Sequence, residues 1–456
     1  MKQKTQVDLL HGPIMKSLII FMIPILISNI FQQLYNAVDT AIVGNFLGEN
    51  SLAAIGACAA VFEMLVQFCN SLGNGFSIVC GRAFGSGDEE RIKKAVATSI
   101  LIGAVTCVVL TMACIVGLKP LLQLIHTPAE IIEESHTYIH IIGLGLIVMF
   151  AYNLASCMLR AIGNSVMPLV FLIISSLLNI FLDVLFITTF HMGVAGAAIA
   201  TVLAQGVSVV LCIIYILKYT QILVPEPRHF KFETELFQDV GGQGYAMALM
   251  GSIVSVGSII LQSGINSLGT EIIAGHVAAR KLYMFCNMPF MSMSVAVSAF
   301  ISQNKGANQG DRILRAMRDA YIYDFVMAAI VSAFLFTCAP SMVKLISGST
   351  NPTIIRNGSK MLYIVGPFYA ILGVLIQTRF ALQGIGSKLI PMISSVIELV
   401  GKILFVYIFI PMFGYDAVCW CEPLIWVAMT AQLLYAFNTN SYVKQIRAEQ
   451  KAAAAA

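Results

Sequence analysis

Charge is scarce in this sequence of 456 residues: only 11% of them are Asp, Glu, Lys or Arg, while 58% are hydrophobic. A water-soluble protein of this length could not hide so much apolar surface. The net charge is only +4 and no long basic run occurs, so nothing indicates a nucleic-acid partner. The composition therefore excludes a soluble multidomain protein and predicts many membrane spans.

Other absences narrow the functional classes. The 11 cysteines show no paired spacing and lie mostly in apolar runs, which predicts small buried side chains rather than disulfides. No G-x-x-x-x-G-K-[ST] motif is present, so ATP hydrolysis within this chain is not expected. No metal-ligand cluster or nucleophile–base arrangement stands out, and we expect neither an enzyme nor a cofactor. Because the stretch Met1–Pro13 is polar, we do not expect it to act as a cleavable signal.

Twelve apolar runs are long enough to cross a bilayer, which needs about 20 residues. Their approximate limits are 15–43, 51–78, 93–118, 133–157, 167–190, 194–217, 237–263, 272–300, 313–338, 360–383, 390–412 and 416–440. With span-end residues assigned to the nearer loop, 20 Lys and Arg lie on the side of both termini and 4 lie opposite. The positive-inside rule then places both termini in the cytoplasm and predicts a multi-pass protein of the inner (plasma) membrane.

The chain repeats itself faintly. "GSGDEERIKKA" after the second run aligns with "GANQGDRILRA" after the eighth at an offset of 221, and "LRAIGNSVMP" aligns with "LQGIGSKLIP" at 223. We therefore expect an all-α integral membrane fold of twelve transmembrane helices in two pseudo-symmetric six-helix lobes around a central cavity. Residues 1–217 form the predicted N-terminal lobe, 218–236 a predicted cytoplasmic linker and 237–440 the predicted C-terminal lobe. We expect residues 441–456 to form a cytoplasmic tail, whose terminal alanines look like an artificial extension.

Polar residues form stripes on three of the N-lobe spans. The first span carries four of them at i, i+3, i+4 and i+7: Gln32, Tyr35, Asn36 and Asp39. The fifth carries Asn179 and Asp183, and the sixth Thr201 and Gln205, each pair at i, i+4. Such spacing puts each set on one helical face, and polar faces in membranes turn toward protein or water. Three stripes in one lobe predict a shared polar pocket.

Two carboxylates among amide and hydroxyl groups can serve two kinds of coupling. They can bind a hard cation such as Na⁺, or they can share a proton because burial and mutual repulsion favour one protonated acid. A third interpretation is structural, in which Asn179 and Asp183 only hydrogen-bond helices together. No Lys or Arg stands mid-span in this lobe to neutralise the acids, which favours coupling.

"QQLYNAVDTAIVGNFLGENSLAAIG" in the first span resembles the first-helix signature of multidrug and toxic compound extrusion (MATE) transporters. The resemblance extends over the whole chain, with its Asn-x-x-x-Asp in the fifth span and a threonine in the sixth. It implies an exporter of amphipathic, often cationic compounds driven by H⁺ or Na⁺. It also implies that Asp39, Asn179, Asp183 and Thr201 form the ion site. Some relatives have functional acids in spans seven and ten; this chain has none there, so a second Na⁺ site of that type is not expected.

The C-terminal lobe carries charges of its own. Glu398 and Lys402 stand at i, i+4, with Glu first, the favourable order for an intrahelical ion pair. At the offset of 223, Lys402 is equivalent to Asn179 and could replace a bound cation, then contact an anionic or zwitterionic part of a substrate. The candidate substrate-cavity residues are Gln32, Tyr35, Asn36, Gln205, Glu398 and Lys402. Further charges, on Arg280, Lys281, Asp324 and Glu422, are expected mainly in a structural network.

These patterns favour a secondary multidrug antiporter that works by alternating access. Its expected partners are the lipid bilayer and small-molecule drugs or toxic metabolites, and a single chain with both lobes is the expected functional unit. The alternative is a flippase for lipid-linked or polyanionic intermediates, whose cavity would need many basic groups. A facilitator of the other large twelve-span superfamily is less well supported, because "GRAFGSGDEER" fits its G-x-x-x-D-R loop poorly.

Overall fold

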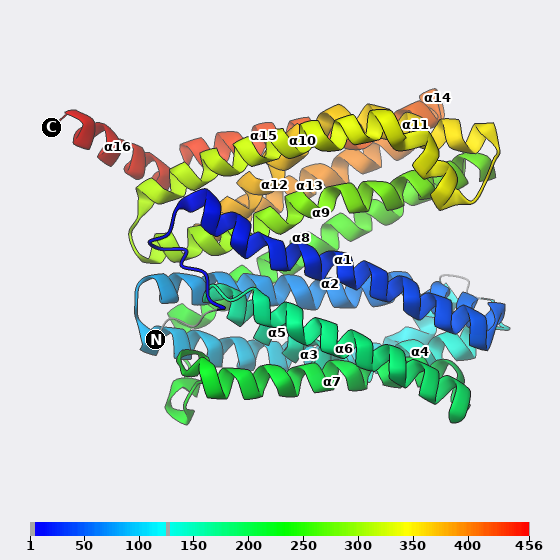
Figure 1. Cartoon of the computed structure of the whole chain (residues 1–456), viewed down its shortest axis with the longest axis horizontal. Helices are drawn as coiled ribbons and strands as arrows, with labels where there is room; N and C mark the ends of the chain where they lie inside the picture. Colours follow the sequence, from blue (N-terminus) through cyan, green and yellow to red (C-terminus); the bar gives the residue numbers. More distant parts are fainter. Residues whose placement is uncertain (1–4, 125–127, 456) are drawn as a thin grey trace. The chain divides into compact units, whose positions relative to one another are not determined.

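A computed structural model describes residues 5–124 and 128–455, and these form an almost entirely helical protein (Figure 1). Residues 1–4 and 125–127 of the predicted first lobe and residue 456 of the predicted tail lie outside the described residues. In the first half of the chain the helices are α1 (Ile14–Leu47), α2 (Glu49–Gly85), α3 (Glu89–Leu124), α4 (Ile132–Leu144), α5 (Leu146–Ala161), α6 (Val166–Val184), the π-helical η1 (Leu185–Thr189) and α7 (Gly193–Tyr219).

Two short 3₁₀ turns, η2 (Gln221–Leu223) and η3 (Pro227–Phe230), follow α7. The remaining helices are α8 (Thr234–Asn266), α9 (Thr270–Gly306), α10 (Gly310–Ser347), α11 (Pro352–Val365), the 3₁₀ turn η4 (Gly366–Phe368), α12 (Tyr369–Gly384), α13 (Leu389–Leu404), the π-helical η5 (Phe405–Phe409), α14 (Ile410–Phe413), α15 (Tyr415–Thr439) and α16 (Ser441–Ala455).

Ten continuous helical segments are long and apolar enough to cross a membrane, and two bent pairs bring the number in the described chain to twelve. One pair is α2, bent by 44° between Ala59 and Val61, and the other is α4 with α5, bent by 48°. No strand occurs in residues 5–124 or 128–455. The predicted all-α membrane fold of twelve spans is therefore confirmed.

The chain divides into two compact units. Within the described residues, the first unit comprises residues 5–7 and Ile23–Ala248, and the second comprises Asp8–Met22 and residues 249–455. Helices α1 and α8 thus each contribute residues to both units, and the boundary in α1 falls one residue before Pro24. The segment before α1 is tied to the second unit, where Arg312 Nη2 donates to the carbonyls of Leu9 at 3.2 Å and Gly12 at 2.8 Å.

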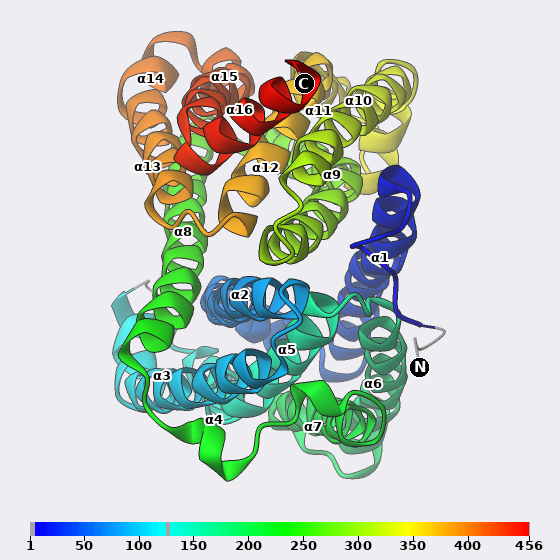
Figure 2. The same ribbon diagram turned by 90° about the vertical axis from the view of Figure 1, so that its left-hand side faces the viewer.

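Within the first unit, α2 packs against α3 and α5, and α6 packs against α7 (Figure 2). The segment between α7 and α8 lies along α3, where Glu90 accepts from Arg228 at 2.8 Å and pairs with His229 at 2.9 Å. Within the second unit, α9 packs against α10, α11 and α12, and α15 packs against α12 and α13. The helices of each unit thus pack against other helices of the same unit.

Glycines inside α8 allow it to pack closely against α2. The stretch Gly241-Gly242-Gln243-Gly244 interrupts the apolar pattern, yet it lies inside α8. A Cβ added to Gly75 of α2 would lie 2.5 Å from the Cα of Gly244 and 2.6 Å from the carbonyl oxygen of Gln243. Absence of side chains lets these two backbones touch, as small residues commonly do in membrane bundles.

Gly75→Ala is expected to destabilise the protein by about 1–3 kcal/mol, because its methyl group would meet backbone atoms that cannot move independently. The matched control is Gly56→Ala in the same helix, where an added Cβ meets nothing within 4 Å. There the better helix propensity of alanine predicts a neutral or stabilising effect of up to about 1 kcal/mol. Thermal unfolding of the two purified variants in detergent measures both. Equal unfolding temperatures would contradict the close α2–α8 contact.

Candidate functional site

The four polar residues of the α1 stripe differ in their exposure. Tyr35 and Asp39 are half-buried, whereas Gln32 and Asn36 are exposed. Positions i and i+4 of a helix point in nearly the same direction, while members at the edges of a stripe diverge from it. Only Tyr35 and Asp39 of the four approach the polar residues of α6 and α7.

Three buried side chains from α6 and α7 complete the cluster: Asn179, Asp183 and Thr201. The Asn179 amide is assigned the orientation in which its nitrogen faces oxygen acceptors, since the opposite orientation would set like groups against each other. Its nitrogen then donates to Asp183 Oδ2 at 2.8 Å and to the Tyr35 hydroxyl at 3.0 Å, and its oxygen accepts from the Thr201 backbone N–H at 3.1 Å. The Tyr35 hydroxyl is also hydrogen-bonded to the Thr201 side chain. We name these four residues, together with Asp39, the unit-1 polar cluster.

The two carboxyl groups of the unit-1 polar cluster face each other. The carboxyl groups of Asp39 and Asp183 lie close enough to hydrogen-bond each other, and such a bond requires a proton between them. Within the described chain, Asp39 Oδ1 and Asp183 Oδ1 are buried without a hydrogen-bond partner. No Lys, Arg or His of the described residues pairs with either acid. Carboxylate oxygens that have neither a hydrogen-bond partner nor a basic side chain beside them suit a site that takes up a proton or a small hard cation.

The helix geometry next to Asp183 also indicates a functional site. The π-helical η1 begins two residues after Asp183, and π-helical turns inside α-helices occur often at functional sites. Tyr138 of α4 is buried close enough to act electrostatically on Asp39 and Asp183. The sequence offered no signal for Tyr138, because it stands in a span without a polar stripe. Gln205 of α7 is half-buried, and its Oε1 has no partner within residues 5–124 and 128–455.

Tyr35→Phe is expected to raise the half-saturating concentration of the coupling ion about 2- to 12-fold, since it removes one hydroxyl that orients Asn179 and Thr201. The measurement is the initial rate of ion-driven transport against ion concentration in proteoliposomes. Tyr245→Phe is the matched control, because it also removes a hydroxyl bonded to a threonine, Thr106 at 2.7 Å, in the same unit. An equal effect of the two substitutions would contradict a specific role for Tyr35.

In the second unit, Glu398 and Lys402 form the predicted i, i+4 ion pair, with Lys402 Nζ donating to Glu398 Oε1 at 2.8 Å. Lys402 is only 2% exposed and also donates to Ser258 at 3.2 Å. The π-helical η5 begins three residues after Lys402. Arg379, near the end of the predicted span 360–383, lies inside α12 with Nη2 4.0 Å from Glu398 Oε2.

The other C-lobe charges divide between pairs and isolated positions. Arg280 Nη1 donates to Glu422 Oε1 at 2.5 Å, so this part of the expected network is present. Asp324 stands apart, buried and accepting from Gln377 Nε2 at 3.1 Å. Lys281 is exposed on α9. Among the described residues no group of three or more His, Cys, Asp or Glu is arranged to hold a metal ion.

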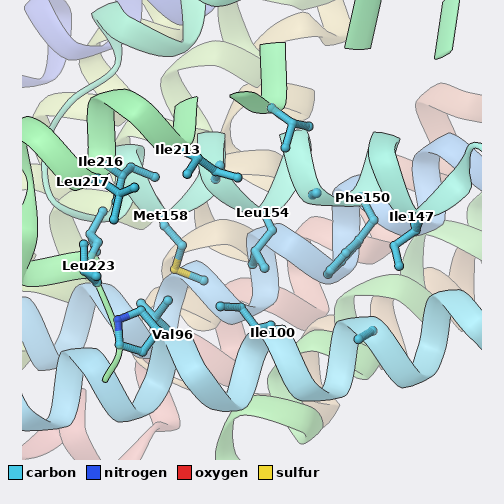
Figure 3. Close-up of a pocket in the computed structure, with 16 residues that line it drawn as sticks. Val96, Ile100, Ile147, Phe150, Leu154, Met158, Ile213, Ile216, Leu217 and Leu223 are labelled. Atoms are coloured by element: carbon cyan, nitrogen blue, oxygen red, sulfur yellow. The ribbon is translucent and has the colours of Figure 1, made fainter. Parts of the chain in front are cut away.

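An apolar pocket of about 360 Å³ lies elsewhere in the first unit, between α3, α5, α7 and residues 223–225 (Figure 3). Ile100, Leu154 and Ile213 point into it from the three helices. Its lining contains no ionisable side chain and no member of the unit-1 polar cluster. A wall of hydrocarbon alone offers no group for an ion, so the pocket is not part of the candidate site.

Comparison with known proteins agrees with the fold and the repeat. The sequence model of the MatE family matches the chain twice, at residues 24–185 and 246–408. The probable multidrug resistance protein YpnP of Bacillus subtilis is 26% identical over 378 residues, covering 83% of each chain. The probable multidrug resistance protein NorM of Thermotoga maritima is 24% identical over 398 residues, covering 85% of this chain and 83% of its own.

Solved structures of MATE proteins have the same fold as this chain. A crystal structure of a MATE protein in the bent conformation superposes with a TM-score of 0.89 at 25% identity and covers 100% of both chains. A transporter of the MOP superfamily from Pyrococcus furiosus, described as having a binding pocket of reverse polarity, superposes with a TM-score of 0.86 at 24% identity. The superposition covers 96% of this chain and 100% of the Pyrococcus furiosus chain. At 24% sequence identity, this similarity shows a shared fold and nothing more.

Proposed function

The chain belongs to the MatE family of multi-pass membrane transporters, and on that premise we propose that it is a secondary active multidrug antiporter. It exports amphipathic, often cationic compounds in exchange for H⁺ or Na⁺ by alternating access. The relatives named for multidrug resistance support the substrate class. The proposal includes neither an enzymatic activity nor a cofactor.

One observation carries the coupling proposal: two intramembrane carboxyl groups face each other in the first unit without a basic partner among the described residues. An ionised acid in a membrane is costly unless something neutralises it. A proton shared by Asp39 and Asp183 removes one of the two negative charges. Na⁺ bound by oxygens of Asp39, Asp183, Asn179 and Thr201 does the same, once the Asn179 amide has turned its oxygen toward the acids. Whichever ion binds, its departure leaves unpaired charge that the protein must accommodate by rearranging.

Bending of helix α1 can produce that rearrangement. Its residues Ile23–Leu47, which include Asp39, belong to the first unit, while its earlier residues belong to the second. Pro24 stands at the boundary and removes a backbone hydrogen bond of the helix, which allows bending there. Ion binding at Asp39 therefore acts on an element shared by both units, and coupling arises if drug and ion each bind the two conformations unequally.

The same proposal includes location and assembly. The excess of Lys and Arg on one side supports insertion into the inner (plasma) membrane with both termini cytoplasmic. One chain carries both MatE segments, which supports a functional monomer. Residues 218–236 act as the cytoplasmic linker between lobes 1–217 and 237–440.

The flippase alternative fits the charges less well. A lipid-linked pyrophosphate needs several unopposed cations, and in the described part of the second unit the cations Arg280 and Lys402 are bonded to Glu422 and Glu398. That pairing leaves too little positive charge for a polyanion.

The test of the proposal uses proteoliposomes loaded with ethidium. A pH gradient and a Na⁺ gradient are imposed separately, and the initial rate of ethidium efflux is recorded. The antiporter proposal predicts accelerated efflux under one of the two gradients and identifies the coupling ion. Efflux at the rate of protein-free liposomes under both gradients would refute it.

A further inference from the structure

Five charged side chains of the second unit meet where four helices pack. Arg280 comes from α9, Arg379 from α12, Glu398 and Lys402 from α13, and Glu422 from α15. Besides the two ion pairs described above, Arg280 also interacts electrostatically with Glu398, and Lys402 with Glu422. The two pairs therefore form one connected group, which we name the unit-2 charge cluster.

The unit-2 charge cluster has more positive than negative charge. Its three cations face two carboxylates, so one positive charge is uncompensated within the cluster. Arg379 is the cation without a close partner: its nearest carboxylate oxygen, on Glu398, is 4.0 Å away, beyond hydrogen-bond reach. Its Nε and Nη2 are buried, and no described residue accepts a hydrogen bond from them.

An unsatisfied guanidinium away from water is costly unless an anion joins it. Guanidinium N–H groups form a planar fork that matches the two oxygens of a carboxylate. One surplus charge suits one monoanionic group. By contrast, a diphosphate would leave the cluster with an excess of negative charge.

The cluster has an accessible end and a buried end. The Arg280 side chain is 32% exposed, Arg379 is 11% exposed and Lys402 is 2% exposed. Arg280 is held in place because its guanidinium lies 4.8 Å from the centre of the Tyr283 ring and bonds Glu422. Entry past Arg280 would bring an anionic group to donors that are already positioned, which lowers the entropy cost of binding.

The two units thus carry opposite surplus charge at related positions. In the first unit, Asn179 stands beside two acids without a basic partner; in the second, its repeat equivalent Lys402 belongs to a group with three cations. A cation suits the former site and an anion suits the latter.

We propose that the unit-2 charge cluster binds the carboxylate of a substrate, with Arg379 as its principal donor, so that amphipathic zwitterions and monoanions are substrates of this transporter. This proposal rests on the proposed export function only in calling the bound molecule a substrate. The binding site itself does not depend on that function. Arg379 and Arg280 contact the anionic group, and Lys402 keeps Glu398 occupied so that this acid does not compete for Arg379.

The test compares two dyes that differ by one charge. Rhodamine B carries one carboxylate and one delocalised cation, and its ethyl ester keeps only the cation. Fluorescence anisotropy gives the affinity of each dye for the protein in lipid nanodiscs. Wild type is expected to prefer rhodamine B, and Arg379→Gln is expected to lower that preference about 10-fold, the loss of a charge-assisted hydrogen bond.

Arg379→Gln is a mild change because no hydrogen bond of this side chain to a described residue is broken by it. The control is Lys281→Gln, which removes an exposed cation next to Arg280 and should keep the wild-type preference. If Arg379→Gln does not fold, benzoate competition in wild type decides: displacement of rhodamine B but not of its ester is expected.

A folded Arg379→Gln variant with the wild-type preference, or failure of benzoate to compete, would overturn the proposal and leave the cluster a structural ion-pair network. Proteoliposome efflux separates this result from a failure of the export function. Gradient-driven efflux of the ester without a binding preference would reject only the carboxylate site. A binding preference without any gradient-driven efflux would reject only the antiporter.

Discussion

Asp39→Asn is expected to reduce ion-driven ethidium efflux about 5- to 150-fold, toward the rate of protein-free liposomes. Asparagine has nearly the shape of aspartate and can still hydrogen-bond Asp183, so the helix contact survives. It cannot take up a proton or supply a negative charge, and the unit-1 polar cluster then holds one acid instead of two. The measurement is the initial efflux rate under the gradient that drives wild type.

Glu63→Gln is the matched control for this prediction. Glu63 is an exposed acid in the middle of α2, in the same unit, and it belongs to neither charged cluster. Its neutralisation tests the general effect of removing an intramembrane charge, and gradient-driven efflux should persist. Wild-type efflux in Asp39→Asn would show that Asp39 serves packing alone.

Asn179→Lys is expected to abolish gradient-driven efflux as completely as Asp39→Asn does. The Asn179 nitrogen already lies 2.8 Å from Asp183 Oδ2, so a lysine there places an ammonium group at the acids. A covalently attached cation would occupy the site permanently, as Lys402 does beside Glu398 in the second unit. A permanently filled site cannot alternate between bound and free states, and exchange stops.

Thermal unfolding distinguishes a filled site from a damaged one. A coupling ion that binds the folded protein raises the unfolding temperature of wild type. Asn179→Lys should unfold at a temperature that no longer depends on that ion. Asn179→Met, of similar length and without charge, keeps both acids and should retain part of the dependence. Ion-driven efflux in Asn179→Lys would mean that the transported cation does not bind at these acids.

Much of the first-unit geometry follows from the sequence. Lipid cannot satisfy polar groups, so helices with single polar stripes must turn them toward one another. For α1, α6 and α7 this argument brings Asp39, Asn179, Asp183 and Thr201 into one cluster, and the structure has them in contact. Their role in ion binding stays a prediction. Spacing alone could not show that Gln32 and Asn36 of the same stripe remain exposed.

Arg379 and Tyr138 show what the sequence could not reveal. Arg379 stands five residues before the end of α12, and a count of basic residues treats such a position as part of a loop. Its approach to Glu398 depends on how α12 packs near α13, which no local pattern encodes. Tyr138 joins the acids from α4 for the same reason. Local periodicity fixes which face of a helix is polar, while long-range packing decides which helix that face meets.

The central claim is that an ion bound at Asp39 and Asp183 is exchanged for the exported compound. The most direct measurement reverses the usual experiment: proteoliposomes without any ion gradient are given an outward ethidium gradient, and inward movement of H⁺ or of labelled Na⁺ is recorded. Because coupling is reciprocal, the account predicts ion uptake that rises with ethidium efflux in wild type and is absent in Asp39→Asn. Ethidium efflux in wild type without movement of either ion would contradict it.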